Sequence, residues 1–196
     1  MKQFDLSKTG RPSAQQLEKE LRRLKRKSEI RKSIISTLSA LIVTAAAVTL
    51  ILTQWLPVLQ VQRSSMSPTL RDGEVIIFIT TGQIERGDII AFYQGNQVLI
   101  KRVIAASGDE VDLNDDGSVL LNGAPLDEPY VIAHSMGEYD IALPALVPEN
   151  RFFVLGDQRQ SSLDSRSSEI GTIHQDQIVG KALFRIWPPD NLGSVR

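Results

Sequence analysis

Two side chains in this sequence could carry out chemistry together, Ser65 and Lys101. A serine hydroxyl is a poor nucleophile until a base takes its proton. The chain has no cysteine and only two histidines, so a lysine is the best candidate for that base. Ser65 follows a long uncharged stretch by a few residues, and Lys101 comes 36 residues later. The pair predicts a serine–lysine hydrolase that works at a membrane surface.

Each of these two residues also has a simpler interpretation. Ser65 precedes a Pro-Thr-Leu turn, and serines in loops commonly cap turns. Lys101 lies in the apolar run 98–104, where strand alternation puts it and Arg102 on opposite faces, so one of the two must point towards the more buried side. Burial lowers the pKa of a lysine and makes it a base, whereas a lysine on an edge strand simply discourages aggregation.

A third candidate is the polar segment from Gly156 to Arg166. It is dense in hydroxyls, carboxylates and guanidinium groups, and includes Ser162 and Asp164. Such a segment is either a solvated loop or a set of hydrogen bonds and ion pairs that fixes a catalytic side chain. The local sequence does not choose between the two.

No metal or cofactor is expected. The run from Asp112 to Gly117 resembles the start of a calcium loop, but its twelfth position is Gly123, where a bidentate glutamate is required. We therefore expect a hairpin turn there. His134 and His174 lie in polar stretches without carboxylate-rich spacing, which is typical of surface histidines.

The elements that must position these residues begin with a membrane segment. Residues 33–62 carry no charge, and their core, residues 34–56, is rich in Ile, Leu, Val and Ala. A helix of that core is about 35 Å long, enough to cross a bilayer. It is longer than the apolar region of a signal peptide and is followed by Trp-Leu-Pro-Val-Leu-Gln where a small-x-small site would be needed, so we expect an uncleaved anchor rather than a signal peptide or a buried core helix.

Charge is divided sharply at this segment. Residues 1–32 hold eleven Lys and Arg against four Asp and Glu, whereas the rest of the chain holds eleven against nineteen. A basic arm can bind nucleic acid, but beside an apolar segment it indicates a cytoplasmic N-terminus. Leu17, Leu21 and Leu24 lie at helical spacing, so residues 14–32 are expected to form a short amphipathic helix. Its expected partner is anionic lipid, with a protein partner as the alternative.

Beyond residue 57 the pattern changes to short strands rich in β-branched and aromatic residues and separated by turn signals. No segment of comparable strength has a helical period. The extracytoplasmic part is therefore predicted to be mainly β. The expected strands are Glu74–Thr80, Asp88–Tyr93, Val98–Ala105, Glu110–Leu113, Val119–Asn122, Arg151–Leu155 and Ile178–Trp187.

Four motifs in order give the chain a resemblance to the type I signal peptidases, the bacterial leader peptidases. They are Ser65-Met66-x-Pro68-Thr69-Leu70, Arg86-Gly87-Asp88, Lys101-Arg102-Val103 with Gly108-Asp109, and Gly156-Asp157-x-Arg159 with Ser162-x-Asp164-Ser165-Arg166. One motif alone would be a weak signal, but four in order behind an anchor are specific. The resemblance covers the anchor and the whole part that follows it.

This resemblance implies a membrane-bound serine endopeptidase with a signal-peptidase-type β fold, which removes signal peptides from exported pre-proteins. Ser65 matches the nucleophile, and Lys101 matches the general base. The peptide lies extended beside a strand in this family, with small side chains in shallow pockets. The remaining matches are Ser162 as the hydroxyl that orients the lysine amine, Asp164 and Arg166 as an ion pair beside it, and Met66 in the substrate cleft.

The main departure from the family pattern is Arg63, where Ser or Gly is usual. A serine there helps to hold the oxyanion, so the backbone N–H of Ser65 is expected to carry more of that contact. Arg63 also suggests a hypothesis, that its cation disfavours a second positive charge on Lys101 and keeps the amine neutral. Gln158 replaces the usual Asn as a lesser departure.

The resulting expectation is a single-pass membrane protein. Residues 1–32 form a basic cytoplasmic segment, 33–56 the transmembrane anchor and 57–196 the extracytoplasmic peptidase domain. Pre-proteins and membrane lipid are the expected partners, together with the protein export channel, and nucleic acid is not. Two alternatives are a self-processing serine–lysine peptidase of the repressor-cleaving kind and a non-catalytic signal-peptidase-like assembly factor for surface structures. The first lacks its expected DNA-binding domain here, and the second typically lacks the serine or the lysine.

Overall fold

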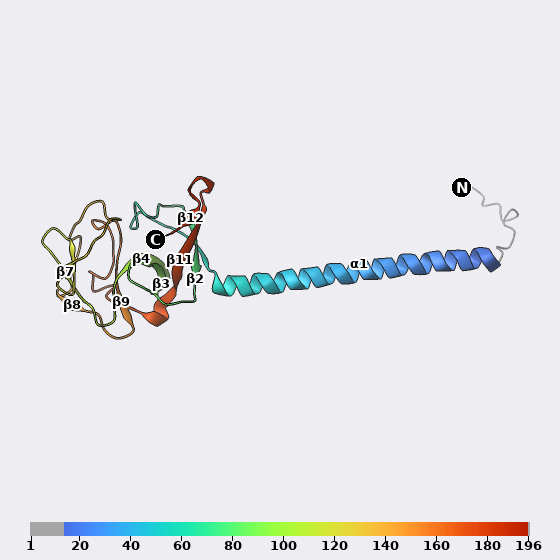
Figure 1. The fold of residues 1–196 in the computed structure, drawn as a ribbon, viewed down its shortest axis with the longest axis horizontal. Helices are drawn as coiled ribbons and strands as arrows, with labels where there is room; N and C mark the ends of the chain where they lie inside the picture. Colours follow the sequence, from blue (N-terminus) through green and yellow to red (C-terminus); the bar gives the residue numbers. More distant parts are fainter. Residues whose placement is uncertain (1–13, 196) are drawn as a thin grey trace. The chain divides into compact units, whose positions relative to one another are not determined.

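A long helix forms the described part of the first of two units in the chain. The computed structural model describes residues 14–195, and the units divide between Ile51 and Leu52. Helix α1 (Ala14–Trp55) contains 42 residues and is drawn in blue to cyan in Figure 1. At 1.5 Å per residue it is about 63 Å long, roughly twice the thickness of a bilayer's hydrocarbon core.

Helix α1 includes the expected amphipathic segment from Ala14 onwards, the first described residue, but it does not stop at Lys32. We expected a separate short helix over residues 14–32, and one continuous helix is found instead. The reason is that residues 14–56 contain neither glycine nor proline, so nothing breaks the backbone hydrogen bonding. The helix ends at Trp55, two residues before Pro57, as the proline predicted.

The apolar half of α1 satisfies its own polar groups. The hydroxyls of Ser39, Thr44 and Thr49 donate to backbone carbonyls three or four residues earlier. Such internal pairing is what a segment in hydrocarbon requires. The segment from Leu17 to Trp55 is long and apolar enough to cross a membrane, as judged by its length and composition.

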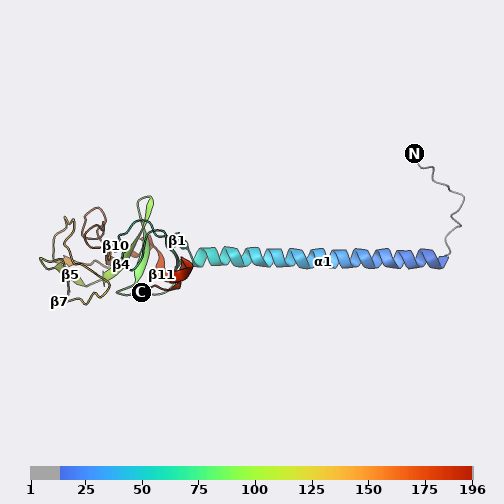
Figure 2. The same ribbon diagram turned by 90° about the horizontal axis from the view of Figure 1, so that it is seen from above.

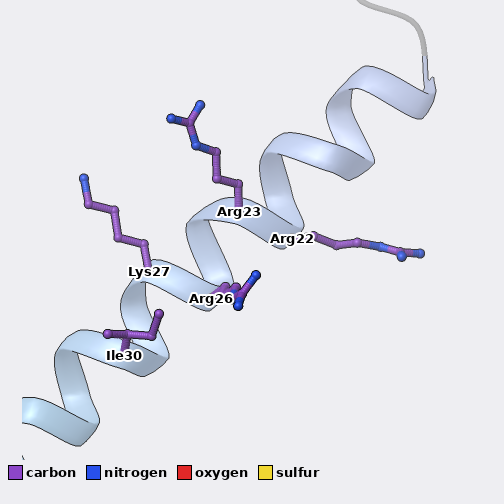
Figure 3. Close-up of a pocket in the computed structure, with 5 residues that line it drawn as sticks. All are labelled: Arg22, Arg23, Arg26, Lys27 and Ile30. Carbon is purple, nitrogen blue, oxygen red and sulfur yellow. The ribbon is translucent and has the colours of Figure 1, made fainter.

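The basic half of α1 displays its charges around the helix. Figure 3 shows Arg23 and Lys27 pointing to one side and Arg22 to another. The Arg22 guanidinium lies 2.7 Å from the carboxylate of Glu18, one turn away. These side chains are exposed, so the ion pair adds only about 0.4 kcal/mol to helix stability.

An antiparallel sheet of eight strands forms most of the second unit. Its order is β1-β2-β11-β3-β4-β9-β10, with β12 paired to the far part of β11. The strands are β1 (Val58–Gln60), β2 (Val75–Ile79), β3 (Ile89–Gln94), β4 (Gln97–Ala106), β9 (Arg151–Leu155), β10 (Ile173–His174), β11 (Ile178–Trp187) and β12 (Gly193–Ser194).

A second sheet of four strands packs within the same unit, in the order β7-β6-β5-β8. In Figures 1 and 2 its strand β7 lies at the end of this unit that is opposite β2 and β1. Strands β5 and β6 form a hairpin, with Asn114 N donating to Ser118 O, so the turn predicted in place of a calcium loop is confirmed. The strands are β5 (Glu110–Leu113), β6 (Val119–Leu121), β7 (Ala124–Pro125) and β8 (Ala145–Leu146).

All seven predicted strands are present, each within one residue of its expected bounds at either end. The strands that the sequence did not predict are β1, β7, β8, β10 and β12, each of two or three residues. Such short strands give no alternation to recognise, and they exist because a neighbouring strand is already in place. Two short 3₁₀ helices, Gln175–Gln177 and Pro189–Asn191, flank β11.

Strand β4 is covered on both faces, which corrects one expectation. We predicted that only one of Lys101 and Arg102 would face the buried side, but both are buried, with 3% and 2% of their surface exposed. The reason lies in the packing of the next residues, because Val103 and Ile104 belong to two different hydrophobic clusters on opposite faces. The end of β4 therefore runs through the interior.

Candidate active site

The nucleophile and base predicted from the sequence lie side by side. Nζ of Lys101 is 2.8 Å from Oγ of Ser65, within hydrogen-bonding distance. Lys101 is placed by β4, which is held between β3 and β9, and Ser65 by the turn that follows β1. Ser65 as a residue is half-buried.

The environment of Lys101 favours its neutral form. Burial lowers the pKa of Lys101 from 10.5 to about 8. The carboxylates of Asp164 and Asp157 oppose this change in the pKa, whereas Arg166 and Arg63 add to it. Arg63 is the smallest of the named contributions, so desolvation does most of what the Arg63 hypothesis assigned to the cation.

The loop that bears Ser65 is fixed by the core and by the polar segment. Met66 and Leu70 are buried in the cluster below β2, with 1% and 0% of their surface exposed. The carbonyl of Ser65 accepts a hydrogen bond from Gln158 N at 3.1 Å. Gly156 lies against the same carbonyl, because a Cβ there would come within 2.5 Å of Ser65 O and 2.1 Å of Ser162 Oγ. Only glycine fits this position.

A buried ion pair joins β4, which carries Lys101, to the polar segment, and through Thr69 to the loop that bears Ser65. Nε and Nη2 of Arg102 donate to the two oxygens of Asp157 at 2.9 and 2.8 Å. Thr69 also donates to Asp157 Oδ2, and Arg102 Nη1 donates to the carbonyl of Gly87 at 2.8 Å. All four sequence motifs therefore meet at Arg102, which contacts Thr69, Gly87 and Asp157 from the other three.

Asp164 and Arg166 also form a buried bidentate pair. Nε and Nη2 of Arg166 donate to the two carboxylate oxygens at 2.8 and 2.9 Å. Asp164 Oδ2 in turn accepts from Gly156 N at 3.1 Å, so the pair positions the glycine that lies against Ser65. The remaining donors of Arg166 reach the carbonyls of residues 135, 136 and 159. The polar segment is thus an interior network, not a solvated loop.

Ser162 is near this site without contacting the base. Its Oγ is buried and makes no hydrogen bond to any group in residues 14–195. Its expected role, to orient the Lys101 amine, needs a contact that this structure does not contain, and it stays a prediction.

Sequence reasoning missed Glu128 and Tyr130. Glu128 is fully buried, and both of its oxygens accept hydrogen bonds from Arg159. Tyr130 donates to Glu128 at 3.0 Å, and its ring lies 3.9 Å from the guanidinium carbon of Arg102. Burial raises the pKa of Tyr130 well above its usual value, and the Glu128 carboxylate adds to this rise. No sequence signal indicated Glu128, because Arg159 is 31 residues away.

The motif Arg86-Gly87-Asp88 supports β4 and β11 and does not reach the catalytic pair. Arg86 pairs with Asp109 at 3.3 Å, and Asp88 pairs with Lys181 at 3.2 Å. Gly87 has a φ of 91°, which only glycine adopts readily, and this conformation aims its carbonyl at Arg102. The motif therefore has a structural role.

A cleft of about 1130 Å³ opens beside Ser65 and Lys101. One wall is the segment from Val58 to Met66, which includes β1, and the other is the β3–β4 hairpin from Gln94 to Lys101. Figure 2 shows the turn of this hairpin, in green, projecting from the body of the unit. Leu163 and Ile170 add apolar surface to the lining. Met66 also lines this cleft, and its expected contact with substrate stays a prediction.

Both walls of the cleft have an unpaired strand edge. Strand β1 ends the order of the large sheet, and β9 pairs with β4 only from Arg102 onwards. Within residues 14–195, the far edges of β1 and of Gln97–Lys101 therefore have no partner strand. Successive antiparallel pairings from β1 through β2, β11 and β3 to β4 make β1 and β4 run in the same direction, both towards the catalytic pair.

Known proteins resemble this chain along most of its length. The family model described as "Signal peptidase, peptidase S26" matches residues 34–187. Signal peptidase IB of Staphylococcus aureus is 36% identical over 182 residues, which cover 83% of this chain and 92% of that protein. Signal peptidase I S of Bacillus subtilis is 31% identical over 170 residues, which cover 81% of this chain and 91% of that protein.

Among solved structures, a signal peptidase I from Enterococcus faecalis matches 51% of this chain and 97% of its own. Its sequence identity is 30%, and the TM-score is 0.43. The family match to well over half of the sequence, together with the two relatives, confirms the family that the four motifs predicted. The chain belongs to the signal peptidase family, peptidase S26, and is a hydrolase that cleaves signal peptides.

Proposed function

We propose that Ser65 and Lys101 are the catalytic pair of this peptidase. Neutral Lys101 removes the Ser65 proton, and Oγ attacks the scissile carbonyl to form an acyl-enzyme. The proton passes to the leaving amine, and water activated by Lys101 then hydrolyses the ester. The observation that carries this proposal is the 2.8 Å separation of Nζ and Oγ at a lysine whose pKa is lowered to about 8.

The oxyanion in this mechanism requires donors near Ser65. The backbone N–H of Ser65 has no hydrogen-bond acceptor within the described residues 14–195, so it is available to the developing negative charge. The side chain of Arg63 is exposed, and it does not replace the serine hydroxyl that is usual there. The Ser65 N–H is therefore the principal oxyanion donor in this proposal.

The substrate in this proposal binds as an added strand. A peptide laid between β1 and β4 meets two unpaired edges that run in one direction, and backbone hydrogen bonds to both complete the sheet. A peptide that runs in the same direction as β1 and β4 brings the residues before the cut into the cleft. Its scissile carbonyl then reaches Ser65 at the end of the cleft.

Four further residues have supporting roles in this proposal. Asp164 and Arg166 hold Gly156, and through it the Ser65 carbonyl, in place. Ser162, whose hydroxyl has no acceptor or donor among the described residues, turns towards the Lys101 amine when substrate binds. Met66 forms part of the cleft floor.

In the proposed topology, the cleft lies on the extracytoplasmic side of the membrane that α1 spans. The apolar part of α1, within residues 33–56, spans the bilayer, and the basic residues of Figure 3 lie on the cytoplasmic side. Residues 57–196 then lie outside, where signal peptides emerge. Anionic lipid contacts the basic segment of residues 1–32, and the protein export channel delivers the pre-proteins.

One assay tests the catalytic pair and the substrate class together. The full-length chain in detergent is incubated with a pre-protein whose signal peptide ends in Ala-x-Ala. Cleavage after the second alanine by the native chain, and none by Ser65→Ala or Lys101→Ala, is the expected result. Near-normal cleavage by Lys101→Ala would refute the base. A native chain that binds pre-protein without cutting it would indicate the non-catalytic assembly factor instead.

A further inference from the structure

Arg63 lines the cleft but has no role in the proposed catalytic mechanism. It precedes Ser65 by two residues and lines the cleft together with Ser65 and Lys101. Its side chain is exposed and forms no ion pair or hydrogen bond with any residue in the range 14–195. The Arg63 cation is close enough to influence Lys101, whose pKa it lowers slightly.

The backbone holds Arg63 in an unusual conformation. Its φ is 69°, in the left-handed region that costs a residue with a Cβ about 1 kcal/mol. Its N–H donates to Oδ1 of Asp72 at 2.7 Å, which fixes the peptide at this point. A glycine would adopt this conformation without cost, so the arginine side chain is not explained by the backbone.

The charge of Arg63 is not balanced inside the cleft. The other charged residues of the lining are Lys101 and Glu169. Glu169 lies near the turn of the β3–β4 hairpin, where its carbonyl accepts from Gln94, and so at the end of β4 away from Lys101. When Lys101 is neutral, Arg63 is therefore the cation of the lining nearest in sequence to Ser65; Asp72 binds its backbone N–H, but within residues 14–195 no carboxylate pairs with its guanidinium.

We propose that Arg63 determines specificity, favouring pre-proteins with an aspartate or glutamate at the first or second position after the cut. The proposal rests on the function proposed above. Residues before the cut lie between β1 and β4, whereas Arg63 follows the end of β1 and lies next to Ser65. In the proposed binding mode the substrate runs in the direction of β1 and passes Ser65 where the chain continues from β1 through Arg63, so a side chain just after the scissile bond is placed on the Arg63 side. A carboxylate there meets the unpaired guanidinium.

The expected size of the effect is modest. Ion pairs between exposed side chains contribute about 0.2–1 kcal/mol, which corresponds to a preference of up to about fivefold. A substrate lysine at the same position is disfavoured by repulsion. Both effects weaken as salt is raised, because the groups are solvent-exposed.

Peptides that differ only in charge test this proposal. Substrates that end their signal segment in Ala-x-Ala carry Glu, Gln or Lys at the first or second position after the cut. The value of kcat/KM is measured at pH 9 and low salt, where Lys101 is largely neutral. The enzymes are the full-length native chain, Arg63→Gln, Arg63→Glu and a control, Arg71→Gln, which removes an exposed arginine that does not line the cleft.

The preference for Glu over Lys is read as a ratio within each enzyme, so a general loss of activity cancels. We expect the native chain and Arg71→Gln to prefer Glu, Arg63→Gln to lose the preference, and Arg63→Glu to reverse it. An unchanged ratio in Arg63→Glu, or an equal change in Arg71→Gln, would overturn the proposal. If the native chain fails to cleave the Gln peptides as well, the proposed function itself fails, which is a different outcome.

Discussion

At the scale of single residues, the proposed mechanism depends on the burial of one lysine. Lys101 exposes only 3% of its surface, and burial is the first cause of its lowered pKa. The negative charges of two carboxylates, Asp164 and Asp157, keep that pKa from falling further, although each carboxylate is also paired with an arginine. The balance leaves an amine that can be neutral near physiological pH.

The pH dependence of activity follows from that balance. Lys101 works as a base only when neutral, so kcat/KM should rise with pH and level off above about 8. Below pH 7 the fall should approach tenfold per unit. Initial rates with an Ala-x-Ala peptide between pH 6 and 10 measure this limb. Arg63→Gln should move the limb slightly to higher pH, and an unmoved limb would show that the Arg63 cation does not influence the amine.

The same lysine reduces the stability of the second unit. Its pKa is about 8 when folded and 10.5 when unfolded, so the unfolded chain binds more protons between these values and stability rises across that window. The difference corresponds to about 3 kcal/mol. The native chain should therefore gain about 3 kcal/mol from pH 8 to pH 10.5 relative to Lys101→Met. Denaturation of both proteins in detergent, followed by tryptophan fluorescence, gives the difference, and parallel pH curves would contradict it.

At the scale of elements, the site depends on the close approach of the segment around Gly156 to the loop that bears Ser65. Gly156 has no room for a Cβ between Ser162 and the carbonyl of Ser65. The ion pairs of Arg102 and Arg166 fix the segment around Gly156, because Arg102 binds Asp157 and the partner of Arg166, Asp164, accepts from Gly156 N. The position of Ser65 is thus set by the contact between its carbonyl and the backbone of Gly156, and not by the conformation of its own loop alone.

Adding one methyl group should reveal this contact. Gly156→Ala should displace Ser65 and lower kcat by about a hundredfold, in keeping with the sensitivity of near-attack geometry to shifts of 1 Å. Gly193→Ala is a matched control, because a Cβ there meets no atom within 4 Å. Its kcat should equal that of the native chain. Equal activity of both variants, with the fold checked by circular dichroism, would rule out the backbone contact as the positioning device.

The sequence was sufficient for the elements with a clear period and for the residues of the four motifs. It predicted the seven longer strands, the end of the helix before Pro57 and the proximity of Ser65 and Lys101. It did not predict that both Lys101 and Arg102 are buried, because alternation describes one strand and not what covers its two faces. The sequence did not predict the role of Glu128 for a related reason. Its partner Arg159 is distant in the sequence, so no local pattern indicates that the two form an ion pair.

At the scale of the whole molecule, the absence of cysteine makes topology directly testable. Single cysteines can be introduced at Ser28, in the basic half of α1, and at Asp115, in the exposed β5–β6 turn. In intact cells, a membrane-impermeant maleimide should label Asp115→Cys and leave Ser28→Cys unlabelled. Permeabilised cells, in which both should react, are the control. Labelling of Ser28→Cys in intact cells would reverse the proposed orientation.

The two parallel strand edges at the cleft have a consequence for how many proteins one such enzyme can serve. A peptide that pairs with β1 and β4 is recognised through its main chain, which is the same in every protein. Unrelated exported proteins can then share one enzyme, provided that each can extend for a few residues near the cut. Selectivity is left to a small number of side-chain positions, so the repertoire of substrates can change through single substitutions on the cleft walls while the reaction stays the same.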